Sequence, residues 1–194
     1  VIQGVDSPKG KAVVPAVREL EKLVLGRKVI VCPCESSPED KHKRHRAQVF
    51  ISDKSVAEHL LRKCLVGLYY FSKCDSKIAD ELYRAYLDGW QSGLNLCRNK
   101  KVIQAKDAAS HVGSFTVVEG TITNARTASY PLMFSMEGLK VVIFRDDLGR
   151  LKSSGIAPEE WGAGTRLKVF GQISDYNGAE IILRSAHQVL EVVR

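Results

Sequence analysis

The stretch that most constrains the fold runs from residue 41 to residue 71, where a basic segment, a strand pattern and an amphipathic helix follow one another. Residues 47–51 have a strand-like composition. Ser55 and Glu58 have the spacing of a capping box, in which each side chain bonds a backbone N–H near the start of a helix. Apolar residues then recur at helical spacing from Val56 onward. The stretch therefore predicts a cationic loop mounted on a strand and a helix. The loop contains Lys41, His42, Lys43, Arg44, His45 and Arg46.

Charge is divided unevenly along the 194 residues. Residues 1–104 contain 19 Lys and Arg and 12 Asp and Glu, whereas residues 105–194 contain ten of each, so the whole net charge of +7 lies in the first half. A basic region beside a neutral one favours an anionic partner, most often nucleic acid. The alternative is a bias that serves solubility alone. No run of eighteen apolar residues occurs, so we expect no membrane span.

All five cysteines also lie in the first half. An odd number argues against a complete disulfide framework. Cys64 lies on the apolar face of the helix that starts near Val56, which is an ordinary core position for a thiol. Cys32 and Cys34 have no second Cys or His pair that would complete a zinc site. We therefore expect no structural metal and an intracellular, reducing compartment, with a mitochondrial location also open.

The second half changes character and predicts a separate β domain at residues 108–194, after a linker at 99–107. Asn177 and Gly178 predict a tight hairpin turn, because this pair accepts positive φ angles. Gly120 is expected to form a bulge or bend, and Trp161 to fill the core. Short strands around one irregular insertion match a five-stranded OB-type barrel. The expected strands are 115–124, 131–135, 140–144, 165–174 and 180–183, with 188–192 as an extension.

The first half, residues 1–98, reads as an α+β domain. A strand is expected at 1–5 and another at 28–34. Between them a helix starts near Pro15 and ends at Gly26, which is typical of a glycine that follows the last helical turn. A last helix begins near Asp75 or Ser76 and is closed by its two glycines. These are Gly89 and Gly93.

This order of motifs resembles the staphylococcal (micrococcal) nuclease-like domain from its third strand onward. Residues 1–8 are similar to that family's strand and turn, 21–29 to its first helix and following strand, and 44–65 to its basic loop, strand and second helix. Residues 80–94 resemble its last helix, and 108–193 resemble the OB-fold domain that follows it in some proteins. The resemblance implies an OB-type barrel with helices, followed by a five-stranded OB barrel.

The family's chemistry is calcium-assisted hydrolysis of phosphodiesters. The resemblance places Asp6 at a metal-binding carboxylate and Arg44 at the second catalytic arginine. It also shows departures, because Val1 stands where the first arginine belongs and Lys9 replaces a carboxylate, while the first metal-binding aspartate precedes this chain. A lysine there repels a cation. Substitutes for the missing carboxylate could come from Glu19, Glu35, Glu39 or Asp40.

Three functions follow from these patterns. The leading one is nucleic-acid binding, to DNA or RNA, on a degenerate nuclease domain that has lost catalysis and needs no cofactor. The second is a Ca²⁺-dependent nuclease. The third is a structural subunit of a larger assembly, with a protein partner that completes the first barrel. For Phe134 and its aromatic neighbours, a place in the barrel core is the alternative to base contact. The nucleic-acid-binding candidates are Lys41, Lys43, Arg44, Arg46, Tyr69, Arg126, Phe134 and Arg145, with Tyr70, Tyr130 and Phe144 as further aromatic candidates.

Overall fold

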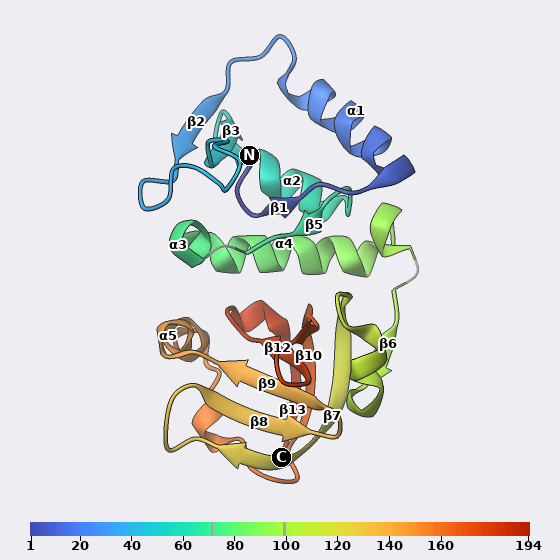
Figure 1. Cartoon of the computed structure of the whole chain (residues 1–194), viewed down its shortest axis with the longest axis vertical. Helices are drawn as coiled ribbons and strands as arrows, with labels where there is room; N and C mark the ends of the chain where they lie inside the picture. The colour runs from blue at the N-terminus through green and yellow to red at the C-terminus, as the bar shows by residue number, and fades with distance from the viewer. Residues whose placement is uncertain (71, 99) are drawn as a thin grey trace. The chain divides into compact units, whose positions relative to one another are not determined.

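The computed structural model describes residues 1–70, 72–98 and 100–194 (Figure 1). The backbone divides into two compact units, Val1–Lys100 and Lys101–Arg194. The first unit combines helices with short strands, and the second is built on a curled sheet with flanking helices. The chain is therefore a mixed α+β protein with a barrel-type sheet.

In the first unit, strand β3 lies between β2 and β4, and β1 pairs with β5; all these pairs are antiparallel. The segment before β1 lies alongside the start of β3, where Ile2 forms a parallel bridge with Ala47. The elements are β1 (Val5–Asp6), η1 (Gly10–Ala12), α1 (Val13–Val24), β2 (Ile30–Pro33), β3 (Ala47–Ile51), β4 (Lys54–Ser55), α2 (Val56–Arg62), β5 (Gly67–Leu68), α3 (Ser72–Asp75), η2 (Ser76–Ile78), α4 (Ala79–Ser92) and η3 (Asn95–Cys97).

Helices α2 and α4 form the core of the first unit. The Ser55 half of the predicted capping box is confirmed at the start of α2, where the Ser55 hydroxyl accepts a hydrogen bond from the Glu58 N–H at 3.3 Å. Gly93 ends α4 in the left-handed region, with a φ of 66°. Gly89, however, lies inside α4 and does not end it. A β-carbon at position 89 would overlap the carbonyl oxygen of Leu61, so this glycine lets the two helices approach closely.

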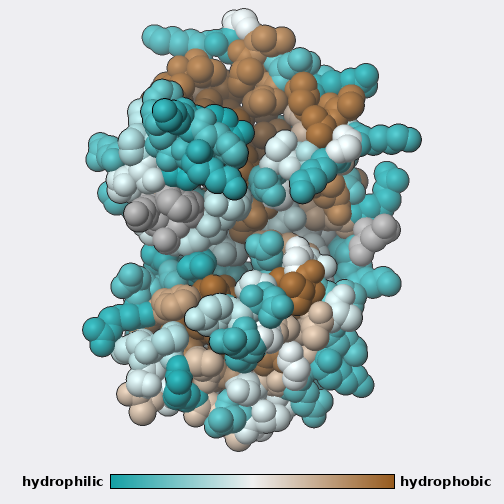
Figure 2. Space-filling model, in the orientation of Figure 1, coloured by the Kyte–Doolittle hydropathy of each residue, from teal (hydrophilic) through white to brown (hydrophobic). Residues whose placement is uncertain are grey.

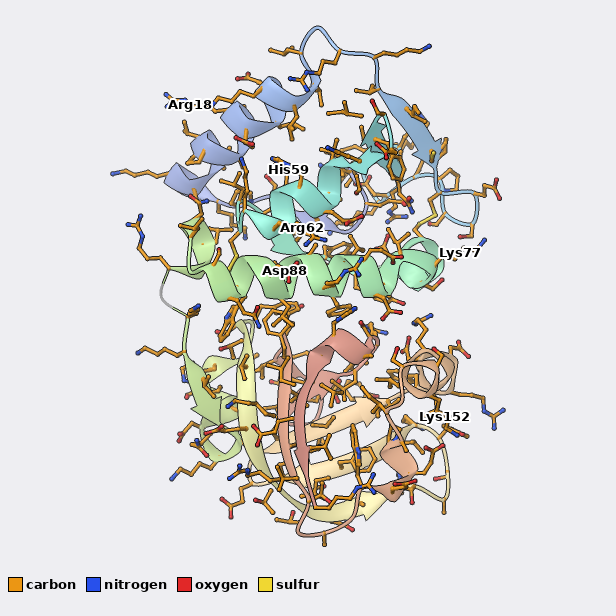
Figure 3. All side chains as sticks on the ribbon, turned by 180° about the vertical axis from the view of Figure 1, so that it is seen from behind. Arg18, His59, Arg62, Lys77, Asp88 and Lys152 are labelled. Atoms are coloured by element: carbon orange, nitrogen blue, oxygen red, sulfur yellow. A yellow bond between two sulfur atoms is a disulfide. The ribbon has the colours of Figure 1, made fainter. Side chains whose placement is uncertain are left out.

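Ionic contacts tie the helices of the first unit together. Glu19 of α1 lies 2.6 Å from Lys63 Nζ and 2.8 Å from His59 Nε2 of α2. The hydrogen bond from Lys63 has the largest effect and that from His59 the next, and they lower the pKa of Glu19 to about 2. Arg62 of α2 and Asp88 of α4 point toward one another and form an ion pair (Figure 3).

Helix α1 and strand β2 leave an apolar surface open. Ala16 is the buried residue of α1, whereas its neighbour Val17 is 44% exposed. Every residue of β2 is exposed, and Ile30 and Val31, which are adjacent and point to opposite faces of the strand, are 50% and 53% exposed. Figure 2 shows hydrophobic side chains gathered on this part of the first unit. The sheet therefore lacks cover on both faces at β2.

The expectation of a free thiol at Cys64 is wrong, whereas the disulfide framework is incomplete, as expected from the odd count. Cys34 is bonded to Cys74, and Cys64 to Cys97, while Cys32 is an exposed free thiol. Cys64 is fully buried, as predicted, but as a half-cystine. An odd count excludes only full pairing, so it left both of these disulfides possible. Disulfides are typical of oxidising settings, so these bonds give no support to a reducing compartment.

The second unit is organised around β7, a long strand with partners on both edges. Its first half pairs with β10 and, in parallel, with β6; its second half pairs with β8. The elements are β6 (Val102–Gln104), η4 (Ala105–His111), β7 (Phe115–Arg126), β8 (Leu132–Met136), β9 (Leu139–Ile143), α5 (Arg145–Ser153), η5 (Pro158–Glu160), β10 (Arg166–Gln172), β11 (Ser174–Asp175), β12 (Ala179–Ile182), η6 (Ala186–Gln188) and β13 (Val189–Val193).

The strand order in this sheet is β11-β12-β9-β8-β7-β10-β13. Strands β7, β8 and β9 form an antiparallel meander, and β12 returns parallel to β9 after α5 and β10. The predicted hairpin turn is present, with φ angles of 53° at Asn177 and 103° at Gly178. Trp161 fills the core, as predicted, with 2% exposure.

Two local predictions in this unit need correction. Part of the expected linker 99–107 is ordered structure, because β6 pairs with β7 and buries Ile103; Asn99 lies outside the described residues. Gly120 does not form the bulge, since the register shift of β7 falls between Ile122 and Asn124. A β-carbon at position 120 would lie 2.6 Å from the β-carbon of Ala105, so the glycine is needed for close packing.

Candidate functional site

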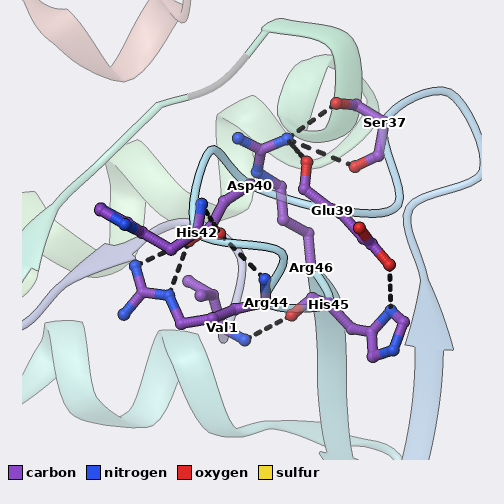
Figure 4. Close-up of polar contacts among 8 residues, drawn as sticks. All are labelled: Val1, Ser37, Glu39, Asp40, His42, Arg44, His45 and Arg46. Carbon is purple, nitrogen blue, oxygen red and sulfur yellow. Dashed lines mark hydrogen bonds and ion pairs between the residues drawn. The ribbon is translucent and has the colours of Figure 1, made fainter.

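The basic loop, defined here as residues 35–46, joins β2 to β3 (Figure 4). Its base is closed by the Cys34 N–H, which donates to the carbonyl of Arg46 at 3.0 Å. Within the loop, the Arg46 N–H donates to the carbonyl of Pro38 at 2.8 Å. The strand β3 that follows begins at the predicted residue. The loop is therefore an ordered excursion between two paired strands.

Asp40 is the acceptor that organises the middle of the basic loop. Its Oδ1 accepts from the backbone N–H of His42 at 2.8 Å and of Arg44 at 3.0 Å, and its Oδ2 lies 2.7 Å from both Nε and Nη2 of Arg44. The backbone N–H of Arg44, followed by its guanidinium and the His42 N–H, holds the pKa of Asp40 well below its usual range. One carboxylate thus fixes the backbone and orients an arginine.

Arg46 stabilises the loop from within. Its Nη1 donates to the Ser37 hydroxyl at 2.7 Å and to the Glu39 carbonyl at 2.6 Å (Figure 4). Its side chain is half-buried, unlike the exposed residues 41–45. The structure therefore places this predicted phosphate contact as a structural residue of the loop.

Lys41 and Lys43 are cations of the basic loop whose side chains are exposed to solvent. Among the described residues, neither forms an ion pair. Lys43 is held at a φ of 60°, and its N–H donates to the carbonyl of Asp40 at 3.0 Å. Arg44 keeps 62% of its side chain exposed despite the pair with Asp40. The histidines are also exposed, and His45 Nδ1 lies 3.8 Å from Glu39 Oε1.

An open cavity of about 330 Å³ lies next to this loop. Asp6 and Arg44, predicted from the resemblance as metal ligand and catalytic arginine, both line it. The rest of the lining is mostly apolar and includes residues of α1 and α2. These are Val1, Ile2, Val5, Ser7, Pro8, Ala16, Val17, Leu20, Leu60 and Val66.

The residues present do not fit a calcium site. Ca²⁺ takes six to eight oxygen ligands, largely from carboxylates and carbonyls, but Asp6 is the one carboxylate among the residues that line the cavity. Asp40 is engaged by Arg44, and Glu19 by Lys63 and His59. Glu35 and Glu39, the other suggested substitutes, do not line the cavity either. No group of three or more His, Cys, Asp or Glu that could hold a metal occurs within the described ranges.

Tyr69 and Tyr70, which follow β5, point to opposite sides of the chain, as adjacent residues of an extended segment do. Tyr69 is 53% exposed, and its N–H donates to the carbonyl of Gly4 at 3.2 Å. The ring of Tyr70 lies 6.2 Å from that of Tyr83 on α4. Tyr69 is therefore the accessible aromatic side chain of the two.

In the second unit, the prediction that Phe134 contacts bases is wrong. Phe134 is fully buried, and its ring lies 5.1 Å from that of Trp161. Strand β8 alternates, with Leu132, Phe134 and Met136 directed into the core, so this ring cannot meet a ligand at the surface.

Other candidates in the second unit are at the surface. Arg145, at the start of α5, places its guanidinium carbon 4.8 Å from the ring centre of Tyr130, a cation–π contact. Tyr130 and Phe144 are 44% and 42% exposed. Arg126 is exposed and contacts the sulfur of Met133.

Sequence reasoning missed Tyr176. It is 70% exposed in the turn between β11 and β12. Its position just before Asn177 and Gly178, in a predicted hairpin turn, was the available signal, because a side chain there has no sheet face to cover.

No protein-family model matches this chain, and no curated protein matches its sequence. Among the described residues, no helix has the length and apolar character needed to cross a membrane.

Proposed function

We propose that this chain is a nucleic-acid-binding protein that contacts phosphate groups through the basic loop. The observation that carries the proposal is the pair Lys41 and Lys43, exposed beside Arg44 on a loop that Asp40 and Arg46 already hold in shape. A loop ordered before binding loses less conformational freedom when it meets its ligand. Lysine and arginine side chains at its tip match a polyanionic backbone.

The folds we propose are the nuclease-like barrel for the first unit and the OB fold for the second. The second assignment is supported by the meander β7-β8-β9, the helix α5 before β10, and the parallel return of β12 beside β9. In OB folds, single strands bind by stacking bases on exposed aromatic rings. The exposed aromatic side chains that could provide such contacts are Tyr130, which Arg145 contacts, Phe144 and Tyr176.

The test is binding measured by fluorescence anisotropy with labelled single-stranded and duplex DNA and RNA over a series of salt concentrations. We expect binding that weakens steeply with salt, because lysine contacts release counterions. The double variant Lys41→Ala, Lys43→Ala should bind more weakly than Lys22→Ala, Lys28→Ala, which has the same net charge but lies outside the loop. Equal affinities of the two variants would contradict the proposal.

A second candidate function is a divalent-metal nuclease, which would need metal ligands beyond the lining of the cavity beside the basic loop, because Asp6 is the one carboxylate there. Asp6 and Arg44 line the same cavity, as a residual catalytic pair would. Incubation of the substrates with Ca²⁺, and then with a chelator, separates this candidate from the binder. Cleavage that requires Ca²⁺ and is lost in Asp6→Asn would support the enzyme, and intact substrates would support binding alone.

A third candidate is a scaffold that binds a protein partner, favoured by the uncovered surface of β2 and α1. Strand β2 pairs with β3 on one edge, and its residues are exposed. Arg27 and Lys28 precede it. The surface therefore suits an extended apolar strand with acidic flanks, added to the β2 edge. Val31→Pro, which disturbs strand pairing, should abolish capture of such a peptide; a peptide with basic flanks should not bind.

A further inference from the structure

We propose that the Cys34–Cys74 disulfide is a thiol-exchange site and that its opening by a small-molecule thiol releases the basic loop. Cys34 immediately precedes the loop, and Cys74 lies in α3, forty residues further along. The bond spans a Cα–Cα distance of 5.5 Å. It therefore ties the first turn of the basic loop to a helix that is distant in sequence.

Ser37 connects this disulfide to the hydrogen bonds within the basic loop. Sγ of Cys74 lies 3.9 Å from the carbonyl oxygen of Ser37, and Sγ of Cys34 lies 3.6 Å from the Ser36 hydroxyl. Ser37 in turn accepts from Arg46 at 2.7 Å. Loss of the bond would free the segment to which the guanidinium of Arg46 is anchored. The Asp40 contacts are local and would remain as a weaker constraint.

Accessibility separates this disulfide from the second one. Cys34 is buried, with 6% exposure, but its partner Cys74 is partly exposed, whereas Cys64 and Cys97 have exposures of 0% and 5%. Attack on a disulfide requires a thiolate to reach one of its sulfurs. We therefore expect a dissolved thiol to attack at Cys74, the one partly exposed residue of these four, before it opens the buried Cys64–Cys97 bond.

The exchange needs one reactant class, a low-molecular-weight thiol such as glutathione. Its thiolate attacks Sγ of Cys74, a mixed disulfide forms, and Cys34 leaves as a thiolate that takes up a proton. A second thiol then attacks the mixed disulfide, giving the oxidised small-molecule disulfide and the free thiol of Cys74. The protein disulfide is reduced by two electrons, and two thiol molecules are oxidised to one disulfide.

The functional consequence rests on the proposed nucleic-acid binding. A loop that is ordered for only part of the time binds with an affinity that falls in proportion to the fraction of time in which it is ordered. If release leaves the loop in its binding geometry about a third of the time, affinity falls about threefold.

The experiment treats the whole chain with graded glutathione, alkylates the free thiols and maps them by mass spectrometry. Hydrogen exchange of residues 35–46 is measured on the same samples. We expect Cys34 and Cys74 to become alkylated before Cys64 and Cys97, with faster exchange at the Arg46 amide, which donates to the carbonyl of Pro38. The Cys74→Ser variant should show this fast exchange without thiol, and Cys32→Ser, the control, should behave like the wild type.

Two results would overturn the inference: a Cys34–Cys74 bond that survives thiol concentrations at which Cys64–Cys97 opens, or an opened bond with unchanged loop exchange. Both readouts are independent of nucleic acid. If no nucleic acid binds in either redox state, the proposed function fails. The alkylation and hydrogen-exchange data still decide whether opening of the Cys34–Cys74 disulfide releases the basic loop. If Cys74→Ser does not fold, the glutathione series on the wild type gives the same decision.

Discussion

Asp40 and Arg44 form an ion pair within one loop, with Oδ2 of the carboxylate 2.7 Å from Nη2 of the guanidinium. The same carboxylate accepts the Arg44 backbone N–H, so the residue is bound by both its main chain and its side chain. This pair changes the interpretation of the basic loop. Of the four cations in the sequence, Arg46 holds the loop in shape and Arg44 is paired with Asp40. The other two, Lys41 and Lys43, are exposed.

These two lysines should determine the salt dependence of binding. Removal of two phosphate contacts lowers the slope of log K against log salt by about 1.8 for duplex DNA and about 1.4 for single strands. We expect this change in the Lys41→Ala, Lys43→Ala variant and not in Lys22→Ala, Lys28→Ala. Anisotropy titrations between low and moderate salt measure it, and parallel slopes for the two variants would be inconsistent with the loop as the contact.

Arg46→Ala should separate loop structure from charge. Because its guanidinium bonds Ser37 and Glu39, its loss should increase hydrogen exchange in residues 35–40, which Lys43→Ala should leave unchanged. Both substitutions remove one positive charge. Identical exchange profiles for the two variants would show that Arg46 does not hold the loop.

Stability of the first unit should fall in acid through Glu19. Its folded pKa of about 2 is below the value near 4.3 of an unfolded chain, so its contribution is present above about pH 4.3 and is lost as pH falls toward 2. Thermal unfolding of wild type and Glu19→Gln across this range tests the assignment. The difference between the two melting temperatures should shrink with falling pH; a constant difference would rule out ionised Glu19 as the cause.

Phe134→Ala should destabilise the second unit by about 3–5 kcal/mol, the usual cost of removing a fully buried phenylalanine. Phe144→Ala is the matched control, because its ring is 42% exposed and its removal should cost clearly less than the removal of the fully buried Phe134. Chemical denaturation followed by tryptophan fluorescence measures both, since Trp161 contacts Phe134. Equal effects would mean that Phe134 is not in the core.

Much of the fold followed from local sequence patterns. The strand at residues 47–51, the Ser55 cap and the turn at Asn177 and Gly178 are local features, and the structure confirms them. Phe134 was misassigned although a signal existed: Leu132, Phe134 and Met136 alternate with less buried residues, which is typical of one sheet face turned inward.

The candidate site was less predictable, because the number of charged residues does not reveal which side chains form hydrogen bonds and ion pairs with one another. Asp40 precedes His42 and Arg44 at the spacing of local side-chain-to-backbone bonds, so its role could have been foreseen. The disulfides could not, since they join residues 40 and 33 positions apart and connectivity is not encoded in spacing. Burial of Ala16 without Val17 likewise depends on which surfaces the tertiary structure covers.

The contact of Gly89 with the carbonyl of Leu61 also limits how this protein can vary. Alanine at position 89 should cost about 1–3 kcal/mol through overpacking, although alanine normally favours helices. At Gly149, where α5 leaves open space, the same change should gain about 0.4–1 kcal/mol. In a saturation library selected for folding, position 89 should therefore return glycine alone while position 149 drifts freely, and glycine at the first site becomes a marker by which distant versions of this chain can be recognised.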